Sequence, residues 1–130
     1  MSKELKGWIV YNGNLATEKF MDYVHWFQRV AEKKNIHVEA KANNNLLVTI
    51  ENGKPKLIVD GDIIENESLP HFVHFHDKDI HLARHLEALG IRLFNRANAI
   101  LLCDNKAMMH QALATSNIPT PKTIIAPKIY

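Results

Sequence analysis

Short apolar runs alternate along this chain with stretches in which apolar residues recur at every third or fourth position. The runs are rich in β-branched and aromatic residues, which is typical of buried strands. They lie at residues 7–11, 36–40, 72–75 and 91–94. The longer stretches, at 17–35, 79–90, 95–102 and 104–116, have the spacing of helices with an apolar face.

Polar residues and glycine mark the ends of the expected helices. Asp79, Asn95 and Asp104 stand where a side chain would accept a hydrogen bond from the first turn. Gly90 suits the residue after a helix, and a segment with three prolines, 118–127, ends the last helix and predicts an extended linker or a last strand.

Strands that alternate with helices predict right-handed βαβ units with helices on both faces of the sheet. We therefore expect an α/β fold with an open, mostly parallel sheet. The pair Asn52-Gly53 between the apolar runs 46–50 and 55–60 predicts an antiparallel β-hairpin inserted into that pattern.

The composition predicts one soluble, cytoplasmic domain. The 130 residues are 46% hydrophobic and 23% charged, as in ordinary globular proteins. A net charge of +2, spread along the chain, disfavours nucleic acid as a partner. The lone Cys103 has no internal disulfide partner, the charged start lacks the apolar segment of a signal peptide, and no apolar run approaches the roughly 20 residues that cross a membrane.

Candidate ligand-binding residues follow the strands. No glycine-rich fingerprint for dinucleotides and no P-loop is present. Asn12 and Asn14 follow the first run, and His76 lies in the segment 75–79 after another. In an open parallel sheet the ligand crevice lies at the carboxyl ends of the strands. These side chains could bind a polar substrate there, or they could only form turns and cap helices.

Lys106 is a second candidate. A lysine in the first turn of a helix opposes the helix dipole, and a bound phosphate would compensate for that repulsion. The alternative is an ordinary solvated lysine.

The histidines suggest a metal site, which is the weaker interpretation. His74 and His76 share a face if the strand extends that far, with His71 before them and His81 and His85 on the next helix. A zinc site needs three or four convergent ligands, so solvated or hydrogen-bonded histidines are the alternative. Cys103 has no nearby histidine to deprotonate it and is assigned no chemistry.

As an ordered set, several stretches resemble the first domain of ATP-grasp enzymes, particularly the RimK-like glutamate ligases. They are Leu-Glu-Ala-Leu-Gly-Ile-Arg-Leu-Phe-Asn at 86–95, Ala-Ile at 99–100, Cys-Asp-Asn-Lys at 103–106, Gln-Ala-Leu at 111–113 and Ile-Pro-Thr-Pro-Lys-Thr at 118–123. The resemblance implies a pre-ATP-grasp, Rossmann-like domain at residues 1–121 and, at 122–130, a linker towards a missing ATP-grasp domain.

The resemblance also implies chemistry. Such ligases use ATP and magnesium to activate a carboxylate as an acylphosphate, which an amine then attacks. Lys106 matches the lysine that approaches ATP from this domain, and Asn12 and Asn14 match the loop on the substrate side. His76 stands where related sequences often have an arginine. The substrates would be small-molecule or peptide carboxylates and amines, and the chain alone is expected to be inactive.

Two other functions fit the sequence. The chain could be a stand-alone α/β binding or oligomerisation module, with a homodimer formed through an exposed hairpin edge. It could also be a small metal protein that uses its histidines.

Overall fold

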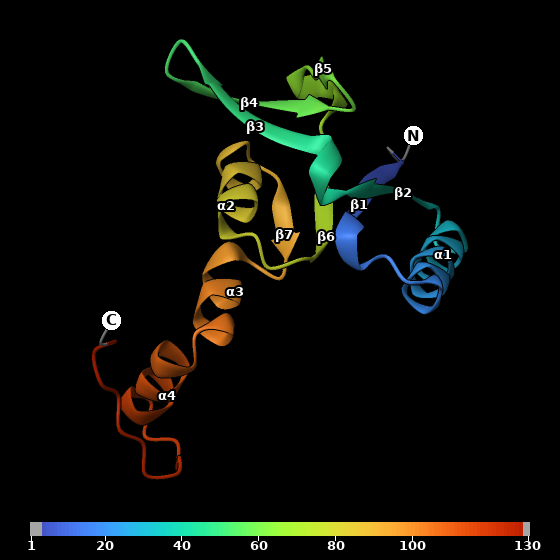
Figure 1. Ribbon diagram of the computed structural model, residues 1–130. Helices are drawn as coiled ribbons and strands as arrows, with labels where there is room; N and C mark the ends of the chain where they lie inside the picture. Colours follow the sequence, from blue (N-terminus) through green and yellow to red (C-terminus); the bar gives the residue numbers. More distant parts are fainter. Residues whose placement is uncertain (1–3, 129–130) are drawn as a thin grey trace.

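A four-stranded parallel sheet forms the centre of the structure, a computed structural model that describes residues 4–128 (Figure 1). The strands are β1 (Leu5–Tyr11), β2 (Ile36–Ala42), β6 (Phe72–His76) and β7 (Arg92–Phe94). Their order is β2-β1-β6-β7, and all three pairings are parallel. The α/β fold with an open parallel sheet is therefore confirmed.

The expected hairpin is also present, in a second, antiparallel sheet. It comprises β3 (Leu46–Glu51), β4 (Lys54–Val59) and a two-residue strand, β5 (Asp62–Ile63), that the sequence pattern did not predict. At the turn, Asn52 and Gly53 have φ angles of 52° and 74°. Left-handed φ angles at both central residues are what a two-residue hairpin turn needs, and Asn-Gly adopts them readily.

Helices cover both faces of the parallel sheet, as expected. They are α1 (Glu18–Glu32), α2 (Ile80–Ala88), α3 (Ala97–Asp104) and α4 (Lys106–Thr115). On one face, Ile9 packs with Val24 of α1 and with Val38. On the other, Val10 and Val73 join a larger core that includes α2, α3 and the inner side of the hairpin. Because neighbouring residues of a strand point to opposite faces, Ile9 and Val10 serve different cores.

The predicted capping residues are correct for one of the three helices. Asp79 accepts a hydrogen bond from the Leu82 amide, 3.1 Å away, at the start of α2. Asn95 and Asp104 were wrong. Helix α3 begins after Arg96, which makes no side-chain cap, and Asn105 rather than Asp104 caps α4 by accepting from the Met108 amide at 3.1 Å. At α4 the prediction is one residue early because Asp104 and Asn105 are both capping types, whereas the cap position of α3 falls on Arg96, which is not a capping type.

The last part of the chain extends away from the sheet. Helix α3 contacts α2, whereas α4 contacts α3 and lies farther out (Figure 1). Helix α4 has no buried residue. Residues 118–128 form neither helix nor strand, so the alternative of a last strand within them was wrong.

Candidate functional site

A cavity of about 560 Å³ opens at the carboxyl ends of the parallel strands. Its polar lining includes Asn12 after β1, His76 at the end of β6, Asp77 and Lys78 just beyond it, and Asn95 after β7. The loops that follow three adjacent parallel strands therefore meet here. This is the position where open α/β sheets bind ligands.

Asp77 ties the loops of the rim together. Its two carboxylate oxygens accept hydrogen bonds from the side-chain amides of Asn12, at 3.5 Å, and of Asn43, at 3.2 Å. The Asn43 carbonyl in turn accepts from the Gly13 amide at 3.0 Å. Residues 65 positions apart in the sequence are thus joined at one carboxylate, which fixes the loop after β1 against the loop after β6.

An aromatic wall closes another side of the cavity. The Tyr23 hydroxyl lies 2.9 Å from Nε2 of His74, and both residues line the cavity. The His74 ring stacks on Phe27 with a centroid distance of 4.6 Å and an interplanar angle of 9°. Stacking and the hydrogen bond together hold the His74 imidazole in one orientation.

His74 is kept neutral by its surroundings. Burial lowers the pKa of His74, and the nearby His76 lowers it further, against an opposing hydrogen bond with the Phe94 backbone. A buried imidazole favours its uncharged form because charge is costly away from water. His74 therefore acts in this wall as a hydrogen-bonding group rather than as a cation.

His76 differs from His74 although both lie on one face of β6. Its side chain is exposed at the cavity, and its ring contacts Phe20 edge-on at 5.0 Å and Tyr23 at 5.6 Å. No hydrogen bond to another residue within 4–128 engages its ring nitrogens. Those nitrogens are free to meet a ligand.

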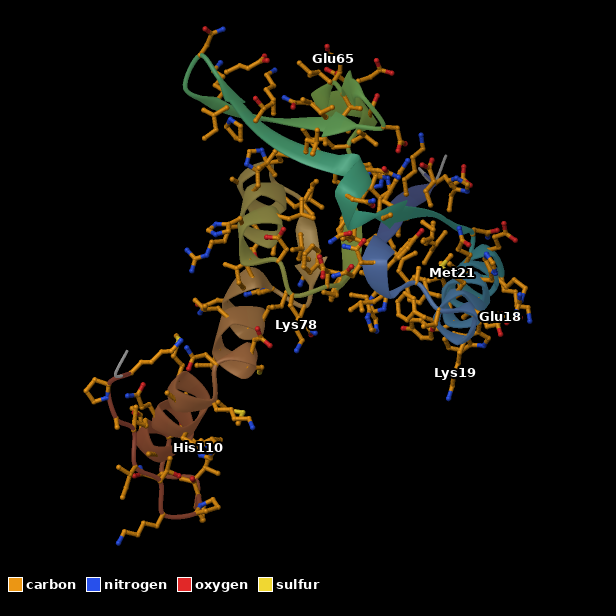
Figure 2. All side chains as sticks on the ribbon, viewed as in Figure 1. Glu18, Lys19, Met21, Glu65, Lys78 and His110 are labelled. Atoms are coloured by element: carbon orange, nitrogen blue, oxygen red, sulfur yellow. The ribbon has the colours of Figure 1, made fainter. Side chains whose placement is uncertain are left out.

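The other sequence candidates lie outside the cavity lining. Asn14 is exposed, and its backbone amide donates to the Asn12 side chain at 2.9 Å. Lys106 is the first residue of α4, and it is exposed. An ion pair of 2.9 Å between Lys78 and Asp104 links the rim to the end of α3, two residues before Lys106. Figure 2 shows Lys78 at this end of the sheet, beside α3.

The histidines do not form a metal site in the described part of the chain. Within residues 4–128, no three His, Cys, Asp or Glu side chains are grouped so that they could hold a metal. Instead, His71 accepts from the Lys6 amide and His85 is hydrogen-bonded to the Lys56 carbonyl. None of the helices described at 4–128 is long and apolar enough to cross a membrane.

Sequence patterns missed several members of this site. Tyr23 and Phe27 fit the apolar spacing of a helix, and nothing local marks Tyr23 as a partner of His74. Asn43 belonged to an Asn-rich turn before the hairpin, a signal for a loop but not for its contact with Asp77. These pairings depend on which strands lie side by side, and only the sheet order reveals that.

Comparison with known proteins finds relatives that match this chain over part of their length. Beta-citrylglutamate synthase B of Homo sapiens is 34% identical over 99 residues, which are 70% of this chain and 25% of that protein. N-acetylaspartylglutamate synthase A of Homo sapiens is 51% identical over 47 residues, 36% of this chain and 12% of that protein. The chain thus spans about a quarter or less of the length of these relatives. No protein-family model matches it.

A solved structure of another protein shares the fold. The crystal structure of D-alanyl-alanine synthetase A from Vibrio cholerae superposes with a TM-score of 0.55 at 17% identity, covering 91% of this chain and 39% of that one. At this identity the similarity concerns the fold alone. The shared fold and the sequence relatives together identify the chain as a homologue of part of the RimK-like ATP-grasp glutamate ligases.

Proposed function

We propose that this chain is the amino-terminal, substrate-side domain of an ATP-dependent ligase that joins a carboxylate to an amine. Residues 1–121 would form the domain, and 122–130 would lead towards an ATP-grasp domain in a longer protein. The observation that carries the proposal is the sequence match to beta-citrylglutamate synthase B and N-acetylaspartylglutamate synthase A. Each of these proteins is several times longer than the matched segment. The cavity at the carboxyl ends of the strands supports it.

In the proposed reaction, ATP transfers its γ-phosphoryl group to a carboxylate oxygen, which gives an acylphosphate and ADP. The amine nitrogen then attacks the acyl carbon, phosphate leaves, and an amide forms. This chain contributes the rim of the substrate cavity, through Asn12 and His76 in the lining and Asn14 beside it. The loops tied by Asp77 hold that rim in place.

Magnesium would stabilise the phosphate charges in this chemistry. Its ligands would come mainly from outside this chain, because no suitable group of three His, Cys, Asp or Glu residues lies within 4–128. For ATP, the proposal assigns one contact to this domain, at Lys106. That ammonium is exposed in the first turn of α4, beside backbone amides that attract anionic oxygens.

Titration of ATP with magnesium tests this division of labour. The 130-residue chain alone should show no tight binding, whereas the longer protein that contains it should bind clearly. Tight binding by this chain alone would mean that the nucleotide pocket is complete here and that the proposed division is wrong.

Lys106 is tested separately in the longer protein. Lys106→Ala should raise the KM for ATP by about 10- to 100-fold, since a charge-assisted contact to phosphate is worth about 1.5–3 kcal/mol. Lys34→Ala is the matched control, because Lys34 is an exposed lysine just beyond the end of α1. Equal KM values for wild type and Lys106→Ala would remove Lys106 from the nucleotide site.

A second function, an oligomerisation module without catalysis, is favoured by the outer side of the hairpin sheet. Leu47 and Ile63 share this side and are 55% and 47% exposed. Sedimentation of the chain tests this function. A stable dimer that dissociates in Leu47→Lys but not in Glu51→Lys, at an exposed polar residue of the same strand, would support the module.

A further inference from the structure

The donor and acceptor roles at the Tyr23–His74 contact follow from the state of the imidazole. Neutral His74 carries one ring proton, and the Phe94 backbone acts on the pKa of His74 as a hydrogen-bond acceptor. Phe94 is paired with His74 in the sheet register. Because Nε2 faces the Tyr23 hydroxyl at 2.9 Å, we place the ring proton on Nδ1, so that Nε2 accepts from Tyr23.

The Tyr23 hydroxyl must then donate its only proton to His74. What remains on its oxygen is a pair of acceptor sites. Because Tyr23 also lines the cavity, the oxygen offers a ligand an acceptor and no donor. The ring of Tyr23 is held in this position by stacking on Trp26, at a centroid distance of 6.0 Å, and by contacts with Phe20 and Phe27.

The charges around the cavity also favour a ligand that donates hydrogen bonds. Asp77 is a cavity carboxylate whose two hydrogen-bond partners are neutral amides, and no ion pair among residues 4–128 engages it. The ammonium of Lys78, in contrast, is paired with Asp104 at 2.9 Å. His76 remains as a group that can accept a hydrogen bond when neutral. An N–H donor is the ligand group that complements these acceptors.

We propose that the cavity receives the amine-bearing substrate and that Tyr23, oriented by His74, is the specificity-determining acceptor for its amino group. The inference rests on the proposed ligase function and deepens it by assigning one substrate to this domain. Asp77 supplies the negative charge on the same cavity, while His74 acts as a positioning residue through Tyr23.

The test compares L-glutamate with glutarate, which has the same two carboxylates and no amino group. Dissociation constants are measured at pH 8 with this chain, by following backbone amide shifts in NMR spectra. L-glutamate should bind about 10- to 100-fold more tightly than glutarate, since a hydrogen bond that involves a charged group is worth about 1.5–3 kcal/mol. Equal affinities, or no binding of L-glutamate, would overturn the inference.

Two variants isolate the Tyr23 hydroxyl. Tyr23→Phe keeps the ring contacts and removes the oxygen, so the preference for L-glutamate should fall to less than about threefold. Tyr11→Phe is the matched control, because Tyr11 lies outside the cavity lining and makes no side-chain hydrogen bond within 4–128. It should retain the full preference. An unchanged preference in Tyr23→Phe would show that another group reads the amine.

The imidazole nitrogen shifts of His74 give a readout that a purely structural contact would not. They should show a protonated Nδ1 and an unprotonated Nε2 at pH 8. A protonated Nε2 would make the Tyr23 oxygen the acceptor from His74 and would overturn the inference. These results are independent of ATP titration in the longer protein, so the ligase proposal and the amine assignment can fail separately.

Discussion

The parallel sheet differs in burial from the arm that helices α3 and α4 form beside it. Strands β1 and β6 contain residues with no exposed surface, such as Ile9, Val10 and Val73. Helix α4 has no buried residue and reaches outwards from the sheet (Figure 1). The sheet therefore carries the stability of the described chain, and the arm carries an exposed lysine at the start of its outer helix.

Because of this difference in burial, the two proposed ligand contacts, the cavity and Lys106, rest on parts of the molecule of unequal stability. The cavity is built on strand ends and is braced by the Asp77 hydrogen bonds, so its shape is fixed by the core. Lys106 depends on α4, whose contacts are with α3. We expect changes in the sheet to disturb the whole structure and changes in α4 to act locally.

The largest effect is expected from Leu86→Ala in α2. Leu86 is fully buried in the core between the sheet, the hairpin and α3. Removing its side chain should lower the free energy of unfolding by about 2–5 kcal/mol, through lost burial and the cavity left behind. Urea unfolding measures this loss. Leu113→Ala in α4 should cost far less, and equal losses would contradict the separation of sheet and arm.

A smaller loss is expected at the brace of the cavity rim. Asn43→Ala removes the hydrogen bonds to Gly13 and Asp77, which should cost about 1–3 kcal/mol. Asn44→Ala is the control, because its side chain makes no hydrogen bond with residues 4–128. Hydrogen exchange should become faster in both loops for Asn43→Ala alone. Unchanged exchange would show that the rim does not depend on Asn43.

His74 should add a pH dependence to the stability of the sheet. Its pKa is lower in the folded protein than in the unfolded chain, chiefly because of burial. The unfolded chain therefore binds the proton more readily, and the free energy of unfolding should fall as the pH drops below the ordinary histidine pKa of about 6.5.

Replacing His74 tests whether this residue causes the pH dependence of stability. His74→Gln should remove part of the acid destabilisation between about pH 7 and pH 5, and His25→Gln, at an exposed histidine of α1, is the control. Thermal unfolding across this range measures both. If the two variants keep the full pH dependence of wild type, His74 does not titrate as its burial implies.

The sequence could predict the sheet because its signals are local. The apolar run that contains Ile9 and Val10, the Asn52-Gly53 turn and the Asp79 cap each act within a few residues, and all three are present in the structure. The start of α4 was displaced by one residue because Asp104 and Asn105 compete for the cap, and that of α3 because the cap position falls on Arg96, which no capping pattern marks. Strand β5 was missed because two residues are too few to show a period.

The candidate site was predictable only in outline. The rule that parallel strands present ligands at their carboxyl ends identified Asn12 and His76, which line the cavity. It could not supply Tyr23, whose role depends on a contact 51 positions away in the sequence. It also gave Asn14 the same weight as Asn12, although the two point to different surroundings.

The smallest global effect is expected from Asn105→Ala, at the cap of α4. Loss of its hydrogen bond to the Met108 amide should destabilise the helix by about 0.5–2 kcal/mol. Because α4 buries no residue, this loss should appear as faster hydrogen exchange within α4 and a nearly unchanged unfolding midpoint. Asp79→Ala removes the equivalent cap from α2, which contributes Leu82 and Leu86 to the core, so it should lower the midpoint of the whole chain. Equal shifts of the two midpoints would mean that α4 unfolds together with the sheet, and Lys106 would then share the rigidity of the cavity.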